Sequence, residues 1–115
     1  MTDIKILIEK ILSFRDARDW KKFHNPKDVT ISLVLEANEV LEHFQWKNED
    51  EIDSYIKTNK NEIGEELADV LYWVLLLSHD LSIDVLDALD KKIDQNDKKY
   101  PIDKVKGKYT KYDKL

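Results

Sequence analysis

Residues 65–77 read EELADVLYWVLLL, and the rest of the fold can be worked out from this stretch. From Leu67 to Leu77 every residue except Asp69 is apolar, which is typical of a helix covered on most of its sides. The longest unbroken apolar run, Val70 to Leu77, is far shorter than the ~20 residues that span a bilayer. The stretch therefore predicts the central helix of a soluble protein, with no membrane as a partner.

Three further helices are predicted from the spacing of apolar residues on either side of this centre. One covers about residues 2–18, capped by Thr2 or Asp3, and its apolar stripe continues to Arg18. A second runs from Asp28, the expected N-cap, to Phe44. The central helix begins between residues 49 and 60 and continues to about residue 79, either unbroken or split near residues 58–60. A fourth is capped by Ser82 and ends before Pro101, so we expect an all-α fold, an antiparallel bundle of four helices or of five if the third is split.

Composition favours one small domain in a reducing compartment. The chain has 115 residues, only 2 Gly and 2 Pro, and no Cys, which excludes disulfide frameworks and thiol catalysis. We predict a single domain over 1–115, with a helical core over about 2–100 and a tail rich in Lys and Tyr over 101–115. No signal-peptide pattern is visible at the N-terminus, so the expected location is cytoplasmic.

The net charge of −5 is unevenly distributed along the chain. Residues 91–115 contain nine Lys and four Asp, a net of +5, so residues 1–90 carry −10. An acidic body of this kind argues against nucleic acid as a partner. A small anionic ligand, held by a metal ion and by the lysine-rich end, fits this distribution.

Two pairs of carboxylates lie beside the apolar stripes of the second and third helices. Glu36 and Glu39 share one helix face, and Glu66 and Asp69 share another, because each pair is three residues apart. A single pair of this kind usually lies on solvated surface, but Asp69 stands within an apolar run. Two facing pairs offer only oxygen ligands, which favours Mg²⁺, with Mn²⁺ as a substitute.

Aromatic side chains occur near both acidic pairs. Trp73 follows Asp69 by one helical turn, Trp46 follows the second helix, and Trp20 and His24 precede it. Aromatic planes beside a metal that binds phosphate suit a nucleobase pocket, although each Trp alone is more often part of a core or an interface.

The fourth helix ends in polar residues. Asn96 and Tyr100 continue its apolar stripe, and Lys92 and Lys99 flank the stripe. Amide, phenol and ammonium groups there can hold phosphate oxygens, and the alternative is a frayed, solvated helix end.

Four stretches of the chain carry a resemblance to a known family. They are Arg15-x-x-Arg18-Asp-Trp20-x-x-Phe23-His24-x-Pro26-Lys27, Glu36-Ala-Asn-Glu39-x-x-Glu42-x-Phe44-Gln45-Trp46, Glu65-Glu66-Leu-Ala-Asp69-Val-Leu and Lys92-Ile-Asp-x-Asn96-x-x-Lys99-Tyr100-Pro101. In this order they resemble the all-α nucleoside triphosphate pyrophosphohydrolases of the MazG-like superfamily, and most closely its dCTP pyrophosphatase-like branch.

The resemblance implies an enzyme that converts a nucleoside triphosphate, with dCTP or a modified dCTP expected, to the monophosphate and pyrophosphate. It implies that Glu36, Glu39, Glu66 and Asp69 bind Mg²⁺ and form the catalytic centre. It also implies that the aromatic residues and His24 surround the base and sugar, and that the polar end of the fourth helix holds phosphates. Relatives assemble as homodimers or homotetramers, which fits the second apolar face on the second helix, formed by Ile31, Val34 and Leu35.

Two alternatives to this function remain open at the level of sequence. The chain could be a non-catalytic helical module whose acidic face binds a basic partner. It could also be a pyrophosphohydrolase for another nucleotide, such as a phosphoribosyl-ATP-type substrate.

Overall fold

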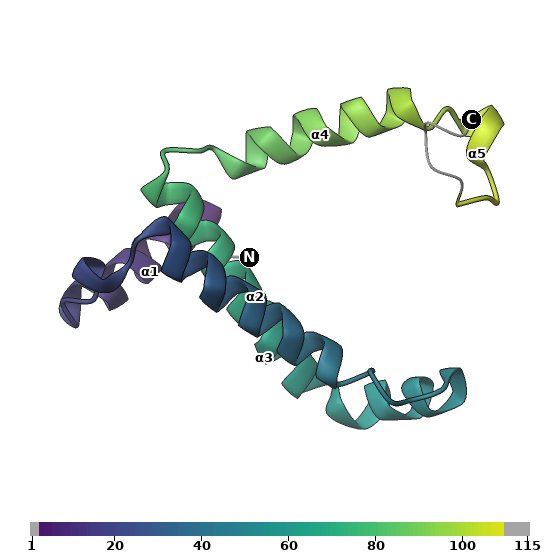
Figure 1. The fold of residues 1–115 in the computed structure, drawn as a ribbon, viewed down its shortest axis with the longest axis horizontal. Coiled ribbons are helices and arrows are strands. Elements are labelled where there is room, and N and C mark those ends of the chain that lie inside the picture. The colour runs from purple at the N-terminus through teal and green to yellow at the C-terminus, as the bar shows by residue number, and fades with distance from the viewer. Residues whose placement is uncertain (1–2, 110–115) are drawn as a thin grey trace. The chain divides into compact units, whose positions relative to one another are not determined.

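The computed structural model describes residues 3–109, and all of their regular structure is helical (Figure 1). The chain divides into two units, residues 1–82 and 83–115. The first holds α1 (Ile4–Ala17), the short 3₁₀ helix η1 (Lys21–Phe23), α2 (Pro26–Glu42) and α3 (Glu49–Asp80). The second holds α4 (Val85–Lys99) and α5 (Ile102–Val105). The predicted all-α class is confirmed.

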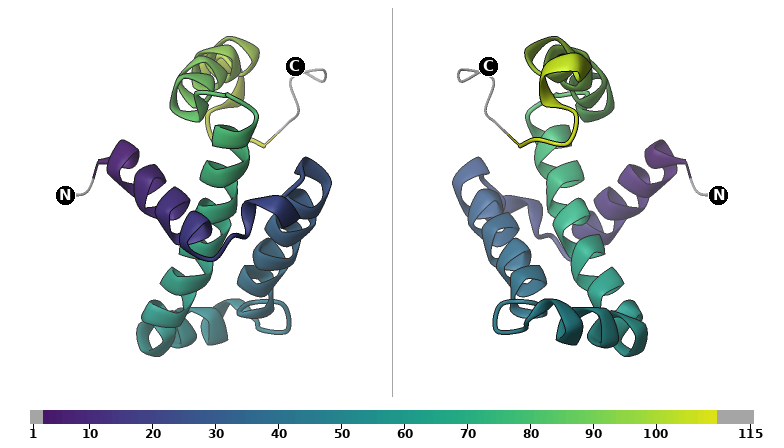
Figure 2. Two further views of the ribbon diagram at one scale, coloured as in Figure 1. Left: turned by 90° about the vertical axis from the view of Figure 1, so that its left-hand side faces the viewer. Right: turned by 90° about the vertical axis from the view of Figure 1, so that its right-hand side faces the viewer.

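In the first unit α3 is the central helix, as the sequence predicts. The α2 helix packs along α3 in the opposite direction, and α1 also packs against α3 (Figure 2). Val29 of α2 and Leu75 and Leu76 of α3 are almost completely buried and form a small core. The arrangement brings the acidic faces of α2 and α3 together.

Two of the predicted helix starts are wrong by a few residues. The N-cap of α2 is Asn25, whose side chain accepts a hydrogen bond from the backbone N–H of Asp28 at 2.9 Å. Pro26 then occupies the first turn, where its missing N–H costs nothing. The N-cap of α4 is Asp84 instead of Ser82, which has a φ of 56° in the turn after α3. Asp3, by contrast, caps α1 as predicted.

The third helix bends at Asn59, where the predicted split lies. Asn59 has non-helical backbone angles (φ −121°, ψ 21°). Its side-chain amide donates to the backbone carbonyl of Tyr55 at 3.1 Å, which is a local alternative to the helical hydrogen bond. The residues before the bend therefore run under the end of α2, and those after it form the long central part (Figure 2).

The apolar stripe of α1 leads to Arg18 in the sequence, but the cation that α1 buries is Arg15. The Arg15 guanidinium is 2% exposed and donates to both carboxylate oxygens of Asp80, at 2.7 and 2.9 Å. Asp80 raises the pKa of Arg15, chiefly through this hydrogen bond. Arg18 is exposed and its guanidinium lies 3.8 Å from the centre of the Phe14 ring. The ion pair thus ties the end of α1 to the end of α3.

The second unit consists of the amphipathic helix α4 and the short α5. On α4 the apolar side chains Leu86, Leu89 and Ile93 are each about half exposed. The sequence predicts no regular structure after Pro101, but residues 102–105 form α5. The last six residues of the predicted tail lie outside the described residues. Among the described helices, none has an apolar stretch long enough to cross a membrane.

Candidate functional site

Three of the four predicted carboxylates meet between α2 and α3. Glu36 and Glu39 of α2 and Asp69 of α3 each place one carboxylate oxygen within 4.8 Å of the others. We refer to these three residues as the acidic cluster. The antiparallel packing of α2 on α3 produces this meeting, because it sets the two acidic faces opposite each other.

Glu36 shows most clearly how crowded these carboxylates are. Burial raises the pKa of Glu36 to about 7, helped by its hydrogen bond with Glu39 and by the charges of Glu39, Asp69 and Glu66. Its Oε2 atom is buried and has no hydrogen-bond partner among the described residues. A buried oxygen without a donor, beside two further carboxylates, fits a hard divalent cation such as Mg²⁺ or Mn²⁺.

The sequence predicts that Asp69 is costly because it is buried among apolar residues, and the structure differs on this point. Asp69 is exposed, and its neighbours Leu67 and Leu71 are about half exposed. Burial of Asp69 among aliphatic side chains is therefore not what makes the cluster costly. The cost comes first from the burial of Glu36 and then from the like charges of Glu39, Asp69 and Glu66 around it.

The fourth predicted carboxylate, Glu66, pairs with a histidine. The ring of His43, the C-cap of α2, contacts Glu66 through Nε2 and the hydroxyl of Tyr55 through Nδ1, at 2.5 Å for the latter. A pocket of about 220 Å³ is lined by Glu39, Glu42, His43, Tyr55 and Glu66, so this network borders the acidic cluster. The sequence analysis missed His43 and Tyr55, although His43 lies seven residues after Glu36 and four after Glu39, on the same helix face.

Several of the predicted aromatic residues come together at the other end of α3. The ring centres of His24 and Trp73 are 5.6 Å apart, edge to face. Trp20 joins the same group through Phe14, whose ring also contacts Tyr72, the neighbour of Trp73. Trp46, after the end of α2, is 86% exposed. The structure thus brings Trp20, His24 and Trp73 into one cluster and leaves Trp46 outside it.

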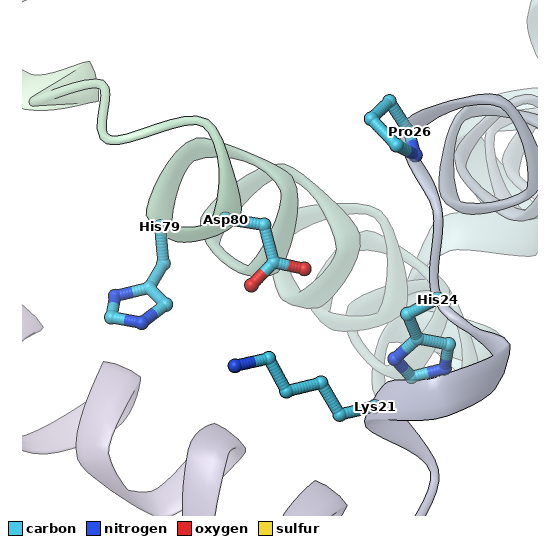
Figure 3. A pocket seen from close by; sticks show the side chains of 5 residues that line it. All are labelled: Lys21, His24, Pro26, His79 and Asp80. Atoms are coloured by element: carbon cyan, nitrogen blue, oxygen red, sulfur yellow. The ribbon is translucent and has the colours of Figure 1, made fainter.

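A second pocket, of about 340 Å³, lies beside His24. It is lined by Lys21, His24, Pro26, His79 and Asp80 (Figure 3). Burial lowers the pKa of His24, and the nearby charge of Arg15 lowers it further. The buried Nδ1 atom of His24 has no hydrogen-bond partner among the described residues. The pocket is therefore lined mainly by polar and ionisable side chains.

The predicted phosphate-binding residues are on α4, in the second unit. Lys92 and Asn96 are exposed, and Tyr100 is the C-cap, with its backbone N–H bonded to the Asn96 carbonyl at 2.9 Å. Their role therefore stays a prediction.

Comparisons with known proteins agree on one family. The model of the MazG-like family matches residues 31–115. The chain is 34% identical over 104 residues to dCTP pyrophosphatase 1 of Mus musculus and 33% identical to that of Homo sapiens, in each case over 89% of this chain. It spans 61% of the length of either protein.

A solved structure shares the fold. It is a pyrophosphatase from Archaeoglobus fulgidus DSM 4304, with a TM-score of 0.82 and 36% sequence identity. The match covers 88% of this chain and 94% of that protein.

Proposed function

The chain belongs to the MazG-like family, and we propose that it is a nucleotide pyrophosphohydrolase that depends on a divalent metal. In the proposed reaction water is added across the bond between the α- and β-phosphates of a nucleoside triphosphate, which gives the monophosphate and pyrophosphate. The observation that carries the proposal is the acidic cluster, since carboxylate oxygens from two helices lie within 4.8 Å of one another there.

Glu36, Glu39 and Asp69 would hold the metal, with Glu66 as a further candidate ligand. Mg²⁺ bound there supplies positive charge for the triphosphate and makes water more acidic. A carboxylate of the cluster that is not engaged as a ligand can accept the proton of the attacking water. The reaction needs no covalent intermediate with the chain, which has no Cys.

The aromatic cluster is the proposed binding site for the base. Trp20 and Trp73 offer planes for stacking, which every base can use, so they set little specificity. His24 lines the neighbouring pocket and is the polar side chain proposed to contact the base edge, because an unpaired buried polar group discriminates more strongly than a missing methylene. The bulk of Trp73 should disfavour purines. We propose dCTP or a modified dCTP as the preferred substrate, in line with the name of the mouse and human relatives.

The remaining part of the proposal concerns the residues that bind the phosphates and the sugar. We propose that Lys92, Asn96 and Tyr100 hold phosphate oxygens that the metal does not reach, and that Trp46 is a further contact for the base and sugar. Lys92 is a cation and Asn96 and Tyr100 carry hydrogen-bond donors, which suits phosphate oxygens.

The decisive experiment is product analysis over a panel of nucleotides. With Mg²⁺, dCTP should give equimolar dCMP and pyrophosphate, Mn²⁺ should substitute, and EDTA should stop the reaction. No turnover of any nucleotide would favour the helical interaction module, and turnover of a phosphoribosyl-ATP-type substrate alone would favour the other alternative. A purine preferred tenfold in kcat/KM, about 1.4 kcal/mol in transition-state binding, would contradict the dCTP assignment and leave the reaction class intact.

A further inference from the structure

We propose that His43 and Tyr55 are positioning residues that hold Glu66 at the edge of the acidic cluster and so strengthen its binding of a divalent cation. This inference rests on the proposed function, because it treats the acidic cluster as a metal site. It assigns a role to two residues outside the acidic cluster: His43 occupies an unspecified position within the second stretch of family resemblance, and Tyr55 lies outside all four stretches.

The three residues come from three segments that the fold brings together. His43 caps the C-terminus of α2, Tyr55 precedes the bend of α3, and Glu66 follows it. On a straight helix residues 55 and 66 would be roughly 16 Å apart along the axis. The bend at Asn59 turns the first part of α3 under the end of α2 (Figure 2), so one imidazole contacts both side chains.

The contacts of the network are satisfied by a neutral His43 ring with its hydrogen on Nε2. A carboxylate only accepts hydrogen bonds, so Nε2 of His43 carries the hydrogen that it donates to Glu66. In a neutral ring Nδ1 is then an acceptor, and the Tyr55 hydroxyl donates to it. Tyr55 thus fixes the ring orientation that points a donor at Glu66.

Tyr55 is itself held by neighbouring side chains. The Lys47 ammonium lies 4.1 Å from the centre of the Tyr55 ring, and the Phe44 ring meets it edge to face at 6.5 Å. His43 and Glu66 are both partly buried, with side chains 12% and 27% exposed. The network is therefore anchored at both ends, in contrast to a surface ion pair between flexible side chains.

The position of Glu66 explains how the network acts on the metal. Glu39, a member of the acidic cluster, lines the same 220 Å³ pocket as Glu66 and His43. The bond to His43 engages one oxygen of Glu66, Oε2, and leaves the other for a cation. Partners of this kind orient metal-binding carboxylates, and their loss typically costs 10–100-fold in metal affinity.

The test compares Mn²⁺ binding to the full chain without nucleotide, by electron paramagnetic resonance and calorimetry, in four variants. His43→Leu should weaken Mn²⁺ binding about tenfold or more. His43→Gln should restore most of the affinity, because its amide N–H replaces the donor at Nε2. Tyr55→Phe, which removes only a hydroxyl, should weaken binding less than His43→Leu. His79→Leu, at an exposed histidine of α3 that lines the other pocket, should bind Mn²⁺ as the wild type does.

The kinetic signature separates positioning from a general loss of structure. In His43→Leu the metal concentration for half-maximal turnover should rise, while kcat at saturating Mn²⁺ stays close to wild type. Unchanged Mn²⁺ affinity in both His43→Leu and Tyr55→Phe would overturn the inference and leave the proposed function standing. Equal losses in His43→Leu and His43→Gln would also overturn it, since packing alone would then account for them. Wild-type chain that binds no Mn²⁺ would overturn the metal site itself.

Discussion

The side chains of Glu36, Glu39 and Asp69 repel one another when no cation lies between them. Removal of one of these charges should therefore lower nucleotide turnover without lowering the stability of the fold. We expect Asp69→Asn and Glu39→Gln to abolish nucleotide turnover, because each removes a ligand from the acidic cluster. The free energy of unfolding without metal should be unchanged or higher, since a like charge is lost. Pyrophosphate release and urea unfolding in EDTA measure the two effects. Glu9→Gln, at an exposed carboxylate of α1, is the matched control, and wild-type turnover by Asp69→Asn would rule out this site.

The raised pKa of Glu36 predicts how pH affects the metal-free protein. Its folded-state value of about 7 lies above the ordinary value of 4.5, so the folded state binds this proton more tightly than the unfolded state. The resulting stabilisation is present below pH 4.5 and is lost as pH rises to about 7. Relative to Glu36→Gln, the wild type should therefore lose stability between pH 5 and pH 8. Urea unfolding of both proteins in EDTA tests this, and parallel pH profiles would contradict it.

The carboxylates of the acidic cluster were predicted from the sequence, but His43 and Tyr55, which lie beside Glu66, were not. The pairs Glu36–Glu39 and Glu66–Asp69 follow from helical spacing, and the structure brings three of the four together. His43 was not predicted, because its contact with Tyr55 depends on the bend of α3 at Asn59, which spacing along α2 does not show. Arg15 was overlooked in favour of Arg18, although it continues the inward spacing of Ile8 and Ile11 by four residues. A partner such as Asp80, 65 residues away, cannot be read from spacing at all.

Among the helices, α3 contains a glycine whose replacement should stabilise the fold. Gly64 lies in the long part of α3, and no atom would lie within 4 Å of an added Cβ. Alanine there should raise the free energy of unfolding by about 1 kcal/mol, because glycine has more backbone freedom to lose. Denaturant unfolding of Gly64→Ala measures the gain.

The contrasting substitution is at the other glycine of the chain. Gly107 has a φ of +79°, a backbone conformation that alanine rarely adopts. Gly107→Ala should therefore give no gain. Equal effects of the two substitutions would contradict the backbone explanation.

The ends of a helix could be predicted where one residue type clearly favours a cap or a break. They were misplaced where several neighbouring residues favour the N-cap position. Asp3 was identified as a cap, and the bend of α3 falls at the asparagine where a split was expected. The starts of α2 and α4 were misplaced because Asn25, Asp28, Ser82 and Asp84 are all residue types that favour caps. In such cases neighbouring residues determine where the helix starts. Pro26 favours the first turn of α2, and Ser82 has non-helical backbone angles in the turn after α3.

At the scale of the whole molecule, the first unit exposes several large apolar side chains on α2. Only Val29, Leu75 and Leu76 are fully buried apolar residues among those described. Val34 and Leu35 on α2 are 61% and 60% exposed. Their helical spacing places them on one face with Ile31, which the sequence analysis assigned to a subunit contact. Apolar faces of this kind mark interaction surfaces.

We therefore expect the protein to self-associate as a homodimer or homotetramer through this face of α2. Light scattering coupled to size exclusion should give a mass at micromolar concentration of at least twice the 13.7 kDa of one chain. Val34→Lys should shift the equilibrium toward the monomer, because a charge would have to be buried in the contact. Glu9→Lys, at an exposed polar position of α1, should leave the mass unchanged. A wild-type chain that stays monomeric at these concentrations would refute the contact.

An association that Val34→Lys leaves intact would mean that the subunit contact lies on another face. The helix α4 would then be the first element to examine, because Leu89 and Ile93 are 56% and 57% exposed there.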